Sequence, residues 1–451
     1  MKKAIKTFLK IKGPTDIGEK LFLLGLFFLP TALPITGLFF ISSLLISFKF
    51  NKLEILNSKV DLGLLIALIL FILSSINNTL IDVPKELITQ DKTHVWSGLL
   101  NWAPMIFFYW GFRPFLKTAT QRIISLKFLI SGSLPVLISF VLQLFSFYGP
   151  HKTFFNLIIW FNKPIDEVGG YTGLFSNPNY AGIFLVLIIP FLFFLFKEEQ
   201  KENLISKFIL SIFIVMTIFF VITTNSRNAL IGLIISFFTL FNINKFSSYF
   251  LIGASSSIVF INYLTNFFNL IKSKIYFDLL PYCQHGSDTS LFCKLIYFNA
   301  GLENPRIRIW LSTFSMIKDR PIWGWGSSTF SKVLPYKNIV AIPYRNLDIQ
   351  HSHNIILEIA HNFGIPTALV LIICVTSVLL KSLNHILIKQ NKNFSNYYLN
   401  RAWIISLIII LFSQLFDITY YDGKISLIFV ILLAGAKCII EENSKLTNNY
   451  S

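Results

Sequence analysis

One stretch of the chain, residues 304–366, gathers most of the side chains that could do chemistry, within a sequence that is otherwise largely apolar. Arg306 and Arg308 lie near its start, and guanidinium groups bind phosphate oxygens through a fixed fork of N–H donors. His351 and His353 lie near its end, and a neutral imidazole can accept a proton from a hydroxyl group near neutral pH. We therefore expect the functional site in this stretch.

The arginine half of the stretch predicts a helix followed by a turn. Residues 306–317 carry apolar side chains at helical spacing, which indicates a helix along the outer membrane face with Trp310 at the level of the lipid headgroups. Either arginine could also be only a solvated charge. Asp319 to Gly326 then indicates a helix stop and a glycine-rich turn, where Gly324 and Gly326 could let backbone N–H groups approach a ligand closely. The alternative is ordinary loop chemistry.

The histidine half of the stretch precedes a second predicted helix. Free N–H groups at a helix N-terminus attract anions, and one of the two histidines is a candidate general base, the alternative being a polar cap residue. Glu358, on the predicted helix, could equally orient a histidine or face solvent. The two histidines could also bind zinc, but no third ligand follows at a metal-binding spacing, so we predict no metal and no cofactor.

A further arginine lies in a polar hairpin between two apolar runs. Arg227 belongs to the segment Thr224–Asn228. A guanidinium at that depth is costly unless it faces a cavity or pairs with an anion. Arg227 is therefore a candidate for binding an anionic substrate, and the alternative is an interfacial arginine that reaches the headgroups.

The composition predicts an all-α, polytopic membrane protein. The 451 residues are 54% hydrophobic, with 48 Phe, and only 14% charged, against about 25% charged in globular proteins. Apolar runs follow one another from Leu21 to Ile440 and indicate about twelve transmembrane helices in a single membrane domain, residues 1–451. Prolines 30 and 34 should divide the run 21–48 into two helices, and the residues 364–366 should interrupt the run 355–380.

The distribution of basic residues predicts the orientation. Most Lys and Arg residues fall in segments that a cytoplasmic N-terminus would place inside, so both termini should be cytoplasmic. The long loop 265–353, inserted between the ninth and tenth spans, should be outside. The net charge of +17 is then a topology signal, and we predict no nucleic-acid partner. Cys283 and Cys293 lie in this loop and could form a disulfide in an oxidising compartment such as a periplasm, or stay as two free thiols.

Five pieces of the sequence together resemble a known family. They are GLFSNPN at 173–179, Ser-Arg at 226–227, ArgxxxTrp at 306–310, DRPIWGWG at 319–326, and HSHNxxLE at 351–358 followed by Gly-Ile-Pro. In this order they resemble the O-antigen ligase/polymerase superfamily of bacterial membrane glycosyltransferases. The likeness covers residues 172–366, and the flanking spans fit in number and hydrophobicity.

The resemblance implies a metal-independent, inverting glycosyltransferase of the helical membrane type called GT-C. Such proteins take a glycan from an undecaprenyl diphosphate carrier at the outer face of the inner membrane and pass it to an acceptor hydroxyl. By motif, Arg227 and Arg308 would hold the diphosphate, and His353, favoured over His351 because Asn354 follows it, would serve the acceptor. The remaining substrate-binding candidates are Arg306, Trp310, Gly324, Gly326, Asn354 and Glu358.

The acceptor stays open at this point. An O-antigen ligase of lipopolysaccharide biosynthesis would use a lipid A core, and a polymerase of polysaccharide biosynthesis would use a growing lipid-linked glycan. The sequence does not separate the two. An alternative from another class is a transporter of a small anion such as inorganic carbon, for which Asp417 and Asp422, near the end of the eleventh span, are the main acidic candidates.

Overall fold

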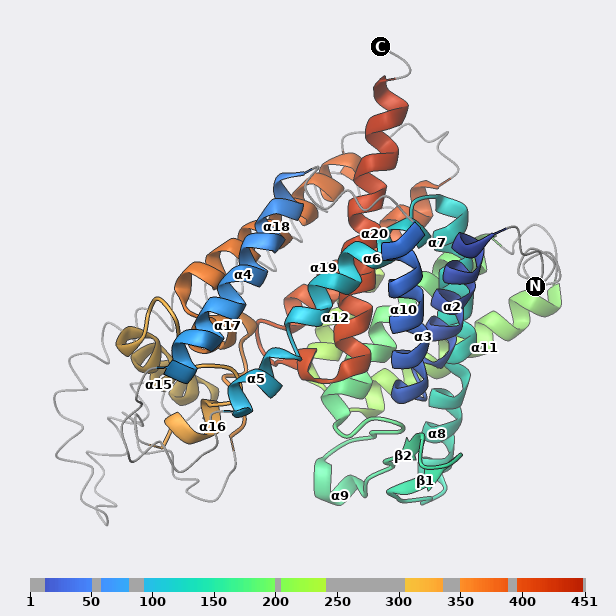
Figure 1. The fold of residues 1–451 in the computed structure, drawn as a ribbon. Helices are drawn as coiled ribbons and strands as arrows, with labels where there is room; N and C mark the ends of the chain where they lie inside the picture. The colour runs from blue at the N-terminus through green and yellow to red at the C-terminus, as the bar shows by residue number, and fades with distance from the viewer. Residues whose placement is uncertain are drawn as a thin grey trace. The chain divides into compact units, whose positions relative to one another are not determined.

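The computed structural model describes residues 13–50, 58–80, 93–198, 204–240, 305–335, 349–387 and 396–448. Helices account for most of these residues (Figure 1). They form two compact units. Unit 1 comprises residues 1–68, 100–241 and 370–451, and unit 2 comprises residues 69–99 and 242–369. Helices α4 (Lys59–Leu80) and α18 (Ile365–Leu387) contribute residues to both units.

Seven helical stretches in the described part of the chain are long and apolar enough to cross a membrane. They are Leu33–Phe50, Lys59–Leu80, Ala119–Leu144, Pro178–Glu198, Leu204–Thr223, Ile365–Asn384 and Gly423–Glu442. Since a crossing needs about 20 apolar residues, this confirms the predicted helical membrane protein. The apolar run 249–264, which also indicates a transmembrane helix, lies outside the described residues.

The first two helices of unit 1 confirm the predicted break at the prolines. Helix α2 (Pro14–Phe28) ends before Pro30, and α3 (Leu33–Phe50) carries Pro34 in its first turn, where the missing N–H costs nothing. The two helices pack on each other. The Phe22 ring of α2 stacks on the Phe40 ring of α3, with centroids 5.7 Å apart.

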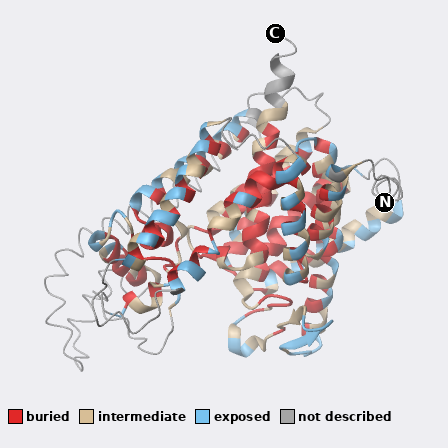
Figure 2. Ribbon diagram, in the orientation of Figure 1, coloured by how far each residue is buried: buried red, intermediate tan, exposed pale blue. Residues whose placement is uncertain are grey.

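Helix α10 (Pro178–Glu198) lies in the core of unit 1. Every residue from Ala181 to Leu192 is buried, as expected for a helix that is apolar on all sides. Helices α11 (Leu204–Thr223), α12 (Arg227–Leu240) and α19 (Tyr397–Ser413) pack around it, and buried residues are concentrated in α10 and α19 (Figure 2). The Ser406 hydroxyl donates to the Leu187 carbonyl at 2.8 Å and links α19 to α10.

The segment between residues 119 and 168 is less regular than predicted. The apolar run 123–147, one of those that indicate a transmembrane helix, forms two helices. They are α7 (Ala119–Gly132) and α8 (Leu134–Leu144), which meet at Ser133, just before Pro135. A short antiparallel hairpin of β1 (His151–Thr153) and β2 (Ile158–Trp160) follows. It is the only sheet in the described residues, and it precedes the short helix α9 (Ile165–Val168).

A buried group of charges joins elements of unit 1 that are far apart in sequence. Arg113, in the 3-10 helix η2 (Arg113–Phe115), donates to Asp61 of α4 at 2.9 Å and to Glu441 of α20 (Gly423–Asn448) at 2.6 Å. Arg122 of α7 pairs with Glu442 of α20. Each buried guanidinium therefore has a carboxylate partner, which offsets the cost of taking the charge out of water.

Unit 2 carries most of the predicted site. Besides parts of α4 and α18 it contains α5 (Thr93–Leu99), α15 (Pro305–Asp319), α16 (Phe330–Val333) and α17 (Ile355–Phe363). The predicted interruption is confirmed, since α17 ends at Phe363, α18 begins at Ile365, and Gly364 between them has φ +90°.

Replacing Gly364 by Ala should destabilise the protein. A Cβ at this position would collide with the Ile322 carbonyl oxygen, a backbone atom that cannot rotate away, and the positive φ adds strain. We expect a loss of about 1–3 kcal/mol or more, measured as a lower thermal unfolding midpoint in detergent. Gly37→Ala is the matched control, because a Cβ on Gly37 meets nothing within 4 Å; an equal loss in both variants would contradict the packing argument.

Candidate functional site

Helix α15 carries Arg308, which is largely buried within unit 2. The helix begins at Pro305 and ends at Asp319, as the predicted stop indicated. Arg308 is only 9% exposed, whereas Arg306 and Trp310 are half-buried. Because α15 packs against α17, the helix that carries Arg306 and Arg308 contacts the helix that follows the two histidines.

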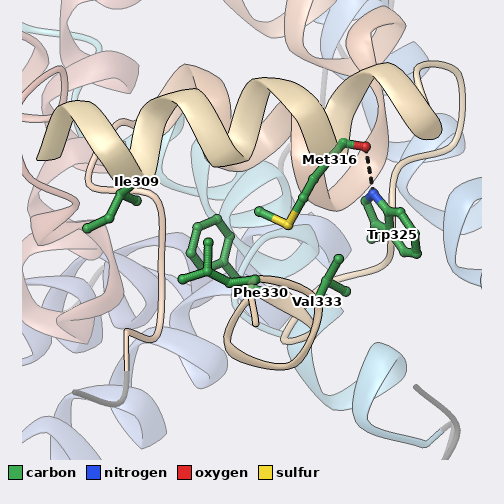
Figure 3. Packing of buried hydrophobic residues seen from close by; sticks show 6 residues of the cluster. Ile309, Met316, Trp325, Phe330 and Val333 are labelled. Atoms are coloured by element: carbon green, nitrogen blue, oxygen red, sulfur yellow. Dashed lines mark hydrogen bonds between the residues drawn. The ribbon is translucent and has the colours of Figure 1, made fainter. Parts of the chain in front are cut away.

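The apolar face of α15 packs on protein. Ile309 and Met316 lie in a buried cluster with Trp325, Phe330 and Val333 (Figure 3). The Trp325 indole N–H donates to the Met316 carbonyl at 2.7 Å. The prediction that this face lies against the membrane is therefore wrong for Ile309 and Met316, which instead anchor α15 to the turn that follows it.

The glycine-rich turn lies along the end of α17. The Trp325 N–H donates to the His361 carbonyl at 2.7 Å, and the Gly326 N–H donates to the Asn362 carbonyl at 3.0 Å. Gly324 has φ +65°, and its own N–H donates to the Arg320 carbonyl. A side chain on Gly324 would meet the backbone of residues 361–363. These amides are thus committed to the fold, and the glycines permit two backbone segments to touch.

The helix α4 residues of unit 2 hold the same turn from another direction. The Ser74 hydroxyl donates to the Trp323 carbonyl at 2.5 Å, and the Asn78 amide donates to it at 3.2 Å. Arg320 donates to the Asn78 side-chain oxygen at 3.1 Å and lies 4.4 Å from the centroid of the Trp325 ring. Partial burial lowers the pKa of Arg320 from its ordinary value. Arg320 therefore has a structural role in the turn.

The histidine turn caps α17. The Asn354 side-chain oxygen accepts from the N–H groups of Ile356 and Leu357 at 3.0 and 3.1 Å, as an N-cap residue does. The Ser352 hydroxyl donates to the Asn354 carbonyl at 2.9 Å. His353, between these two residues, has φ +55°, a left-handed conformation that few residues other than glycine adopt. Non-glycine residues held in this conformation cluster at functional sites.

The backbone of this turn distinguishes the two histidines. The His353 N–H donates to Nδ1 of His351 at 3.3 Å, and the two rings are 4.3 Å apart in an edge-to-face arrangement. A nitrogen that accepts this bond carries no proton, so the neutral His351 ring has its proton on Nε2. In that form neither ring nitrogen of His351 is poised to take a further proton, which favours His353 as the base.

Glu358 holds the histidine turn to α17. Its side chain is 1% exposed, so the alternative that it faces solvent is excluded. One carboxylate oxygen accepts from the Ser352 N–H at 2.9 Å, and the other accepts from the Asn362 side-chain amide at 3.3 Å. The remaining oxygen of Asn362 pairs with Nδ1 of His361 at 2.9 Å. The carboxylate therefore connects the turn that carries His353 to the end of the helix.

His361 is a buried member of this network to which the sequence analysis assigned no role. It is fully buried, and its ring meets that of Phe330 edge to face, with centroids 5.0 Å apart. Burial lowers its pKa, against the opposing effects of Glu358 and Asn362, so the ring is neutral at physiological pH. The sequence offered one signal that His361 is buried: it lies near the apolar residues 357 and 360 on the helix. That signal does not identify the residues that His361 contacts.

Removing the charge of Glu358 should slow the reaction by misplacing the histidine turn. Glu358→Gln offers one acceptor oxygen in place of two, so either the Ser352 bond or the Asn362 bond is lost. We expect kcat to fall about 100-fold, as for small misplacements of a reacting group, with the donor KM unchanged. Glu167→Gln, on the exposed surface of unit 1, is the control. A change confined to KM would argue that Glu358 binds substrate itself.

The other predicted residues belong to unit 1 or lie outside the described residues. Arg227 belongs to unit 1, where it is the first residue of α12 and is exposed, directly after the turn at Thr224 and Asn225. Asp417, also in unit 1, is buried and accepts from the Asn179 amide at 2.8 Å. Cys283 and Cys293 lie outside the described residues, whereas Cys374 and Cys438 are buried free thiols.

A comparison with protein families matches the part of the chain that carries most of these residues. Residues 212–372 match the family model described as O-antigen ligase (Wzy_C). This match includes Arg227, α15, the glycine-rich turn and the histidine turn. This match supports the O-antigen ligase/polymerase superfamily, a glycosyltransferase-like group whose substrates are lipid-linked glycans in general, and together with the apolar helices it indicates a multi-pass bacterial membrane protein. No curated protein matches the chain.

Proposed function

We propose that the protein transfers a glycan from an undecaprenyl diphosphate carrier to an acceptor hydroxyl, with inversion at the sugar carbon and without a metal ion. The observation that carries the proposal is the histidine turn. The His353 N–H donates to Nδ1 of His351, which supports His353 as the base, and Glu358 bonds this turn to α17, on which α15 packs. A buried arginine on α15 then belongs to the same unit as the base.

The reaction follows from these groups. His353 takes the proton of the acceptor hydroxyl, whose oxygen forms the new bond to the sugar carbon from the face opposite the carrier. The bond from that carbon to the diphosphate breaks, and the diphosphate leaves with the electron pair. Arg308 and Arg227 offset the growing negative charge, a task that fixed guanidinium groups perform through charge-assisted hydrogen bonds.

The other predicted residues take supporting roles in this proposal. Arg306 and Trp310, half-buried on the first turns of α15, are the further candidates to contact substrate. Asn354 uses its side-chain oxygen to cap α17. Gly324 and Gly326 act as positioning residues, because their N–H groups bond to protein carbonyls.

The proposal places the chemistry at the outer face of the bacterial inner membrane. The excess of basic residues assigned to the inside supports cytoplasmic termini and a periplasmic loop at 265–353. A GT-C type of architecture and a disulfide between Cys283 and Cys293 belong to the same proposal. Labelling of engineered cysteines in intact cells and spheroplasts checks the orientation.

An assay of the purified protein in detergent tests the function. The donor is an undecaprenyl diphosphate-linked glycan, EDTA is present, and a lipid A core and a second lipid-linked repeat unit are offered separately. Transfer to the core alone identifies a ligase, and elongation alone identifies a polymerase. Loss of activity with EDTA would overturn the metal-independent mechanism, and absence of transfer to either acceptor would overturn the proposed function.

A further inference from the structure

The motif at residues 173–179 is part of the family resemblance but has no role in the mechanism above. The structure anchors its first half inside unit 1. The Gln143 side-chain oxygen accepts from the N–H groups of Thr172 and Gly173 at 3.1 and 2.9 Å. The Lys424 ammonium donates to the Leu174 carbonyl at 2.7 Å and lies 4.3 Å from the centroid of the Phe175 ring. The motif therefore begins as a rigid, buried segment.

The second half of the motif lines an open pocket of unit 1. Most of the pocket wall is polar, and the polar residues that line it are Lys163, Ser176, Asn177, Asn179, Thr224 and Asn225. The side chains of these residues carry ammonium, hydroxyl or carboxamide groups. Such side chains both donate and accept hydrogen bonds, which is what recognition of a hydroxyl-rich ligand requires.

Hydrogen bonds within the wall fix the amides of the pocket. The Asn225 amide donates to the Gly169 carbonyl at 2.7 Å, and the Asn179 amide donates to Asp417 at 2.8 Å. The Asn177 side-chain oxygen accepts from the Asn179 N–H at 2.8 Å. Each amide therefore keeps a fixed orientation, and the side-chain oxygens of Asn225 and Asn179 have no partner among the described residues. These oxygens can accept from a ligand without reorganisation of the wall.

We infer that this pocket binds the sugar next to the diphosphate in the lipid-linked glycan donor. The inference rests on the proposed function. Asn225, in the pocket wall, lies two residues before Arg227, the residue proposed to contact the diphosphate. The first sugar of the donor is bonded directly to that diphosphate. Because Asn225 and Arg227 are only two residues apart, the pocket can bind the sugar while Arg227 binds the diphosphate leaving group.

Two variants of the full-length protein test the inference by direct binding. Lys163→Ala removes the ammonium group, and Ser176→Phe fills the pocket. Affinities are measured in detergent for undecaprenyl diphosphate with and without its glycan. Each variant should weaken binding of the glycan-linked carrier about 10-fold or more, the effect of losing one good contact, and should leave binding of the sugar-free carrier unchanged. Lys152→Ala, an exposed lysine of the β1 strand, should change neither affinity.

The possible outcomes distinguish an error in the pocket assignment from an error in the proposed function. Equal loss for both carriers, or no loss for either, would overturn the pocket as a sugar site while the proposed function stands. Failure of the unaltered protein to bind the glycan-linked carrier would overturn the proposed function, and the pocket assignment with it. Unchanged thermal unfolding of Lys163→Ala ensures that a loss of affinity is not a loss of fold.

Discussion

Replacement of His353 by Ala should abolish glycan transfer while the protein still inserts and still binds its donor. The acceptor hydroxyl would have no base, because the His351 ring accepts the His353 backbone N–H on Nδ1 and carries its proton on the other nitrogen. Loss of a general base costs about 100- to 10,000-fold in rate. The measurement is kcat for transfer by the purified variant, alongside donor affinity.

Two comparisons make this result specific. His94→Ala removes an exposed histidine of α5 in the same unit and should leave kcat unchanged. His351→Ala should reduce activity less than His353→Ala, since it removes a support of the turn and leaves the base. The reverse order of the two variants would assign the base to His351.

Replacement of Arg308 by Ala should have the second largest effect. The residue is 9% exposed on a helix that packs against α17, so its charge acts in surroundings that screen it weakly. Loss of a fixed donor to a developing negative charge costs about 100- to 1,000-fold in kcat. The loss should appear in kcat and in kcat/KM alike, because the charge grows as the diphosphate leaves.

Arg308→Lys and Lys318→Ala serve as the paired controls. A lysine keeps the charge but loses the planar fork, so Arg308→Lys should recover only part of the activity. Lys318, on the exposed side of the same helix, can be replaced without effect. Full activity in Arg308→Ala would remove the arginine from the leaving-group site, and a lowered unfolding temperature in that variant alone would indicate a structural role instead.

Helix ends at proline and glycine were the most predictable part of the fold. The break between α2 and α3 and the break at Gly364 both follow from local backbone restrictions that need no tertiary information. The β1–β2 hairpin was missed, because residues 151–160 lie beside a long apolar run and show no clear alternation. The apolar side of α15 was assigned to the membrane because hydrophobic spacing identifies a buried face but not what covers it.

The site was predicted at the level of segments and not of contacts. The spacing of His351, His353 and Asn354 before a helix identified the turn and its cap. Whether Glu358 faces solvent depends on what covers its side of α17, which the sequence does not show; in the structure it is buried and bonds to Ser352 and Asn362. The amides of Gly324 and Gly326 were predicted to be open to a ligand, but the Gly324 N–H bonds to Arg320 and the Gly326 N–H bonds to α17. Backbone pairing between distant segments leaves little signal in composition.

The pairing of Arg113 constrains how the protein is made. Its two carboxylate partners are Asp61 and Glu441, and 328 positions separate Arg113 from Glu441. While the ribosome is still synthesising the later helices, Arg113 has Asp61 but not Glu441, and Arg122 lacks Glu442. The nascent chain therefore carries incompletely paired arginines until α20 is inserted, and an unpaired charge in an apolar environment is costly, so a chain that lacks α20 should be less stable and more exposed to proteases. Chains truncated before residue 441 should accumulate poorly even though every proposed catalytic residue is present.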